Sequence, residues 1–111
     1  IQGRGVKRDT AAAVKLMRAS AAKGYPPAES GLGRIYADGK WVKQNWREAV
    51  KWTRKGADHG YPVAQFNLAT MYVRGKVVDG KPDKQEAVKW LRKSAAQGYP
   101  PAVKALKELG E

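Results

Sequence analysis

The chain repeats one tripeptide three times, and this repetition constrains its fold more than any other feature. Gly-Tyr-Pro occurs at residues 24–26, 60–62 and 98–100, and an alanine follows two positions later in each case. The copies are 36 and 38 residues apart. A catalytic motif has no need of three evenly spaced copies, whereas a structural unit that stacks on itself has. The spacing therefore predicts a protein built from repeats that pack against one another.

The segments between the tripeptides also align with one another, except for two extra residues near Gly80. The aligned segments are residues 3–26, 39–62 and 75–100, together with 28–39, 64–75 and 102–110. Each unit is interpreted as a shorter first helix, a glycine-containing loop and a longer second helix. The predicted fold is all-α, a right-handed superhelical solenoid of about three helix-loop-helix repeats.

The repeat pattern predicts a single repeat domain over residues 1–111. The expected parts are a partial first unit at 1–26, a second unit at 27–62, a third at 63–100, and a terminal first helix or cap at 101–111. The first unit lacks its first helix and the last lacks its second. We therefore expect the chain to be a piece of a longer protein.

Local signals predict where the helices end and begin. The glycine of each tripeptide suits the left-handed position after a helix, and the proline suits the start of the next helix. Asn45 and Asp83 are expected to cap the second helices, with Glu48 and Glu86 at capping-box spacing. In the first unit Asp9 is expected to begin the second helix, with a weaker cap.

Helical spacing separates the faces of the predicted helices. The first helices place their apolar residues on one side, with Gly33 and Ala69 where a neighbouring helix comes close. Trp52 and Trp90 flank the inner stripe of the second helices and are expected in the core. The Gly-Tyr-Pro motif is thus a corner between helices and not a binding site.

The residue inventory argues against an enzyme. The chain has no cysteine, which excludes disulfides and thiolate metal sites, and His59 is its single histidine. His59 falls in the last turn of a predicted helix, where a cationic side chain favours the helix dipole. Neither a nucleophile–base pair nor a metal site is apparent, so we expect no catalytic residues, no metal and no cofactor.

The aligned residues resemble the Sel1-like repeats, which are α/α repeats related to tetratricopeptide repeats. The second unit matches the family pattern at Ala28, Leu32, Gly33, Tyr36, Gly39, Val42, Ala49, Trp52, Ala57 and Gly60. The third matches at Ala64, Leu68, Tyr72, Gly75, Val78, Asp83, Ala87, Trp90, Ala95, Ala96 and Gly98. Trp41 and Val77 depart from it at loop positions where the family has glycine.

The resemblance implies a non-catalytic scaffold that binds a partner protein or peptide. It also implies a link to bacterial envelope or secretion proteins. In this fold class the first helices line the concave surface. The expected groove residues are Arg34, Phe66, Asn67, Thr70 and Lys104. Two alternatives remain open, since Phe66 could pack against the next unit and Asn67 could serve a local hydrogen bond.

The net charge of +12 supports an alternative function as a polyanion-binding module. Stacked second helices would align a cationic stripe able to follow nucleic acid, an anionic membrane or an acidic glycan such as peptidoglycan. Its members are Lys15, Arg18, Lys51, Arg54, Lys55, Lys89, Arg92 and Lys93. A purely solubilising outer face is the competing interpretation.

Trp41 and Trp46 are peculiar to the middle unit. If exposed, they would form an aromatic patch beside Lys40, Lys43 and Arg47, suited to stacking on a sugar or base. If buried, they would staple the loop onto the second helix. The sequence leaves both interpretations open.

Overall fold

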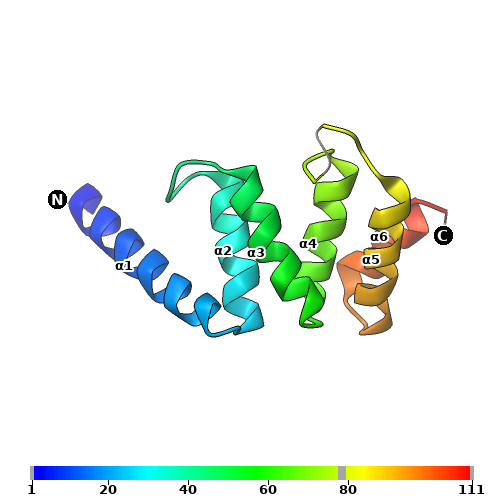
Figure 1. Ribbon diagram of the computed structural model, residues 1–111, viewed down its shortest axis with the longest axis horizontal. Helices are drawn as coiled ribbons and strands as arrows, with labels where there is room; N and C mark the ends of the chain where they lie inside the picture. Colours follow the sequence, from blue (N-terminus) through cyan, green and yellow to red (C-terminus); the bar gives the residue numbers. More distant parts are fainter. Residues whose placement is uncertain (1, 78–79, 111) are drawn as a thin grey trace.

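The computed structural model describes residues 2–77 and 80–110, and within them the chain forms six α-helices (Figure 1). They are α1 (Gln2–Ala22), α2 (Pro26–Asp38), α3 (Trp46–Asp58), α4 (Pro62–Val73), α5 (Lys84–Ala96) and α6 (Pro100–Glu108). The helices follow one another in a row, and the molecule measures 50 × 27 × 24 Å along its principal axes. The predicted all-α repeat fold is confirmed.

Each helix packs mainly against its neighbours along the chain, as expected for stacked repeats. The pairs α2–α3 and α4–α5 are the two complete helix-loop-helix units. Their loops lie at one edge of the molecule and the Gly-Tyr-Pro corners at the opposite edge (Figure 1). We call the surface formed by α2, α4 and α6 the A face, and the surface formed by α1, α3 and α5 the B face.

The Gly-Tyr-Pro corners have the predicted geometry. Gly60 has a φ of +84°, and its two counterparts have +83° and +81°. The Gly60 N–H donates to the Ala57 carbonyl at 3.0 Å and the Tyr61 N–H to the Gly56 carbonyl at 3.0 Å. These two bonds form a Schellman motif, which satisfies carbonyls at the helix end. Pro62 then begins α4 without losing a hydrogen bond.

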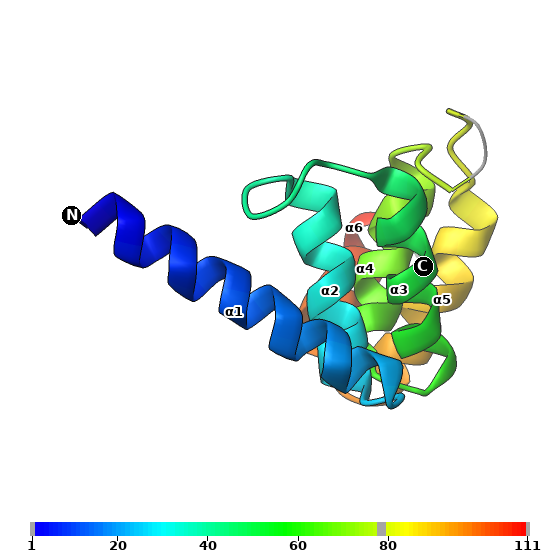
Figure 2. The same ribbon diagram turned by 60° about the vertical axis from the view of Figure 1, so that its left-hand side comes forward.

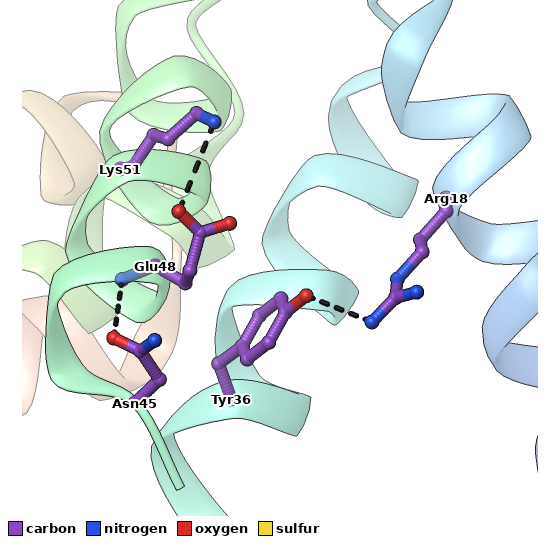
Figure 3. Close-up of polar contacts among 5 residues, drawn as sticks. All are labelled: Arg18, Tyr36, Asn45, Glu48 and Lys51. Atoms are coloured by element: carbon purple, nitrogen blue, oxygen red, sulfur yellow. Dashed lines mark hydrogen bonds and ion pairs between the residues drawn. The ribbon is translucent and has the colours of Figure 1, made fainter. Parts of the chain in front are cut away.

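The predicted caps form, but only half of each capping box. The Asn45 side chain accepts a hydrogen bond from the Glu48 N–H at 3.1 Å (Figure 3), and Asp83 caps α5 in the same way. The Glu48 carboxylate does not return this bond, because the Asn45 N–H already donates to the Tyr36 carbonyl at 3.0 Å. Glu48 instead lies 3.8 Å from the Lys51 ammonium.

The prediction for the start of the first unit was wrong. Asp9 lies inside α1, which begins at Gln2 and extends away from the other helices (Figure 2). In the other units the loop is tied to the preceding helix, by Asn45 N–H to Tyr36 and by Asp83 N–H to Tyr72. In α1 the residues around Asp9 form one continuous helix, whose internal hydrogen bonds satisfy the backbone without such a tie.

The core consists of small residues with a few large ones. Leu68 and Trp90 belong to the larger cluster, which spans α3 to α6, and Trp90 is buried as predicted while Trp52 is half-buried. Gly33 permits the closest helix approach, since a Cβ there would clash with the Thr53 hydroxyl and lie 3.0 Å from the Ala49 carbonyl. The close contact between α2 and α3 therefore requires glycine at position 33.

Candidate partner-binding groove

The A face carries a hollow between α2 and α4. Its volume is about 260 Å³. Four of the five predicted groove residues line it, and only Lys104 does not. The lining residues are Arg34, Ala37, Trp46, Val63, Phe66, Asn67, Thr70, Met71, Arg74 and Tyr99. The structure therefore brings together side chains from two successive units and from the corner before α6.

A second hollow of about 350 Å³ lies one repeat further along, between α4 and α6. It is lined by Phe66, Ala69, Thr70, Val73, Arg74, Leu91, Ala105, Glu108 and Leu109. The two hollows share Phe66, Thr70 and Arg74, which follow one another at four-residue intervals along α4. These three residues form the ridge between the hollows because residues four apart lie on one face of a helix.

Phe66 takes part in both packing and groove formation, which were the two interpretations open for it. Its ring meets the Tyr99 ring edge-on, with the centroids 5.7 Å apart. It packs against the larger core cluster and remains half-buried at the hollows. A rigid, partly exposed aromatic ring is suited to anchoring a bound side chain.

Asn67 and Thr70 are half-buried and linked through the backbone. The Thr70 hydroxyl donates to the Asn67 carbonyl oxygen at 2.7 Å. This bond satisfies the hydroxyl within its own helix. Lys104 is exposed on α6 and lines neither of the two hollows.

The structure adds Arg74 and Trp46 to the groove. The Arg74 guanidinium lies 5.6 Å from the centre of the Trp46 ring and the Lys76 ammonium 5.0 Å from it. Arg74 could have been found from its spacing, four residues after Thr70. Its pairing with Trp46 joins residues far apart in the chain, so no local pattern reveals it.

The two tryptophans of the proposed aromatic patch have different surroundings. Trp46 is half-buried at the α2–α4 hollow, beneath Arg74 and Lys76. Trp41 is 51% exposed in the loop between α2 and α3. Only Trp41 therefore remains available for an open stacking surface in that loop.

Two of the three arginines of the predicted cationic stripe bridge the boundaries between successive units, which we call seams. The Arg18 guanidinium donates to the Tyr36 hydroxyl at 2.9 Å (Figure 3), and Arg54 donates to the Tyr72 hydroxyl at 2.8 Å. Each pair joins the second helix of one unit to the first helix of the next. These two arginines thus hold the stack together, a role the sequence analysis did not assign to them.

The lysines of the stripe stay on the B face, and those on α3 and α5 contact tryptophan rings or carboxylates there. Lys51 and Lys55 lie 5.1 and 4.7 Å from the centre of the Trp52 ring, and Lys93 lies 4.6 Å from that of Trp90. Lys89 pairs with a glutamate one turn away at 3.9 Å. Lys15 and Arg92 are exposed. The lysine stripe is therefore exposed to solvent, although its lysines on α3 and α5 already contact neighbouring side chains.

His59 has a more specific partner than a helix dipole. Its Nδ1 lies 2.6 Å from a carboxylate oxygen of Glu29, whose side chain is only 2% exposed. The third unit has Gln65 and Gln97 at the same positions, and their side chains are hydrogen-bonded at 3.0 Å. Both pairs join the first and second helices of one unit beside the corner. We interpret both pairs as structural contacts that hold the two helices of a unit together, and we call each pair a clasp.

Two further observations bear on the kind of protein. Among the described residues there is no group of three or more histidine, aspartate or glutamate side chains placed to hold a metal ion. Of the helices in the described part of the chain, none has the length and apolar character needed to cross a membrane.

Residues 1–25, 26–61 and 62–99 each match the Sel1 repeat, and the chain belongs to this family. Sel1 repeats are typically protein–protein interaction modules, and the proteins that carry them are generally non-catalytic scaffolds. None of the curated proteins compared with the sequence matches it.

Two solved structures resemble the chain closely. A Sel1 repeat protein from Oxalobacter formigenes is 35% identical, with a TM-score of 0.77 over 86% of this chain and 71% of the other. The protein c5321, a protective antigen of uropathogenic Escherichia coli with the same repeat fold, is 41% identical with a TM-score of 0.75. That match covers 83% of this chain but only 19% of the antigen.

Proposed function

We propose that this protein is a non-catalytic scaffold that binds a partner protein or peptide along its A face. The observation that carries this proposal is the pair of adjoining hollows on either side of the Phe66–Thr70–Arg74 ridge. Interfaces concentrate binding energy in a few aromatic and arginine residues at such hollows. Phe66, Trp46 and Arg74 are side chains of that kind.

Site-specific photo-crosslinking tests the proposal. Benzoylphenylalanine would replace Thr70 on the A face or Lys89 on the B face, and each variant would be expressed in the organism of origin. We expect a discrete crosslinked product from position 70 that disappears when Phe66→Ala is added. Products from position 89 alone, or from neither position, would contradict the proposal.

A second candidate is binding of a polyanion by the lysine stripe of the B face. It is favoured by the net charge of +12 and by exposed lysines on α1, α3 and α5. Binding of DNA, heparin, anionic vesicles or peptidoglycan would be compared at low and high salt. The variant should combine Lys15→Glu, Lys51→Glu and Lys89→Glu, because these changes leave the Arg–Tyr seams intact.

This candidate predicts binding that weakens with added salt and is lost in the triple variant. Binding that the triple variant leaves unchanged would argue against it. A complete absence of binding would do the same and would assign the charge to solubility.

A further inference from the structure

The two hollows of the A face are successive copies of one groove, but their chemistry differs. Arg34 and Asn67 line the α2–α4 hollow, and the residues one repeat later are Thr70 and Ala105 in the α4–α6 hollow. The second hollow is otherwise lined largely by Ala69, Val73, Leu91, Ala105 and Leu109. A ligand lying across the A face would therefore meet a cationic, amide-bearing site and then a largely apolar one whose lining includes Glu108 as well as the shared Arg74.

The α2–α4 hollow is suited to a carboxylate. Arg34 and Arg74 line it, and no acidic residue is among its lining residues. Arg74 lies over the Trp46 ring, which restricts the positions its guanidinium adopts. Guanidinium groups bind carboxylates through charge-assisted hydrogen bonds, often two at a time. The Asn67 side chain adds an amide at the same place, whereas the Thr70 hydroxyl already donates to the Asn67 carbonyl oxygen.

The α4–α6 hollow disfavours the same ligand group. Glu108 lines it, at the position equivalent to Thr70 and Arg34 in the preceding units. Arg74 lines this hollow too, but Glu108 opposes its attraction for a carboxylate, and an apolar side chain would cover Val73 and Leu91. A ligand with one acidic and one apolar end would therefore bind in one direction, with its carboxylate in the α2–α4 hollow and its apolar group in the α4–α6 hollow.

The separation of the hollows predicts the spacing of the groups that fill them. They adjoin across the ridge of α4, and packed helices lie roughly 8–10 Å apart. A peptide in the polyproline II conformation rises about 3.1 Å per residue with three residues per turn. Residues three apart in such a peptide project from the same side, about 9 Å from one another.

We infer that the A face recognises an extended acidic peptide segment with a carboxylate side chain and an apolar side chain three residues apart. The carboxylate lies between Arg34 and Arg74 in the α2–α4 hollow, and the apolar side chain occupies the α4–α6 hollow. This inference rests on the proposed scaffold function and specifies the chemistry of its partner.

The test is selection from a phage-displayed library of random twelve-residue peptides, using the full chain as bait. Enriched peptides would be synthesised with a fluorescein label and measured by fluorescence anisotropy. Variants Arg34→Gln and Val73→Glu probe the two hollows. Both positions are exposed, so these changes leave the fold intact. Arg47→Gln is the matched control, because Arg47 is exposed and lines neither hollow.

We expect enriched peptides to carry an acidic and an apolar residue three positions apart. Arg34→Gln should weaken their binding about two- to five-fold at low salt, as for an exposed ion pair. Val73→Glu should weaken it about five-fold or more, because it places a charge in the apolar hollow. Arg47→Gln should have no effect, and replacing the acidic residue of the peptide by its amide should weaken binding at least as much as Arg34→Gln, because the carboxylate lies between Arg34 and Arg74.

The outcomes separate this inference from the proposed function. Peptides that lose binding on Phe66→Ala but contain no acidic residue would overturn the inference and leave A-face binding in place. A lack of any enriched peptide would also overturn it. If that result were joined by the absence of a crosslink at position 70, the proposed function would fail as well. Acidic peptides indifferent to both Arg34→Gln and Val73→Glu would likewise overturn the inference.

Discussion

The Arg54 guanidinium on α3 donates a hydrogen bond to the Tyr72 hydroxyl on α4 at 2.8 Å and lies 5.9 Å from the centre of the same ring. Arg18 and Tyr36 repeat the arrangement between α1 and α2, at 2.9 and 5.8 Å. Both pairs are 18 residues apart. The same contact therefore fastens the first unit to the second and the second to the third. At the third seam the position equivalent to the tyrosine is Gly110.

Tyr72→Phe should lower the free energy of unfolding by about 1 kcal/mol, because it removes the hydroxyl that accepts from Arg54 while keeping the buried ring. Tyr36→Phe is the matched comparison and should have a smaller effect, since the Arg18–Tyr36 bond is exposed. Urea denaturation measures both. An effect of Tyr36→Phe equal to or larger than that of Tyr72→Phe would contradict this account.

His59→Ala should destabilise the protein by about 1–3 kcal/mol, because it deprives the buried Glu29 carboxylate of its partner. The double variant Glu29→Gln, His59→Gln reproduces the amide pair that Gln65 and Gln97 form in the third unit. It should recover most of the lost stability in thermal or urea unfolding. A double variant less stable than His59→Ala would show that the clasp is not interchangeable between units.

Gly33→Ala should cost about 1–3 kcal/mol by overpacking, because the added Cβ meets the Thr53 hydroxyl and the Ala49 carbonyl. Gly60→Ala should cost about 1 kcal/mol for a different reason, since its position is left-handed but open. A double-mutant cycle with Thr53→Ala separates the two mechanisms. Coupling to Thr53 is expected for Gly33→Ala and not for Gly60→Ala, and the reverse would refute the assignment.

Hydrogen exchange should be faster in α1 than in α3. In residues 9–22 of α1 only Val14 and Ala21 are buried, and α1 packs mainly against α2. Helix α3 has four buried residues and lies between α2 and α4. Segments with few buried contacts open at lower free energy than well-packed ones. Equal protection of amides in residues 9–13 and in α3, measured by mass spectrometry, would contradict this expectation.

The local signals in the sequence were sufficient for the helix ends. Gly60 and Pro62 mark a corner because left-handed backbone favours glycine and proline lacks an N–H, whatever lies nearby. Asn45 caps α3 through the amide of a residue three positions later. Each depends on atoms within a few residues along the chain. The start of α1 was predicted incorrectly because the residues before Asp9 continue the same helix.

Only the tertiary structure decided which residues each long side chain contacts. Arg54 and Lys51 have the same charge on the same helix, yet Arg54 reaches Tyr72 at a seam and Lys51 lies over Trp52. Trp46 joined the groove because α4 places Arg74 beside it. The sequence alone determined the repeat, through the spacing of its motifs, and the corners and the caps of α3 and α5, which follow from neighbours within a few residues. It did not determine the hollows and seams, because packing sets contacts between residues 18 or more positions apart.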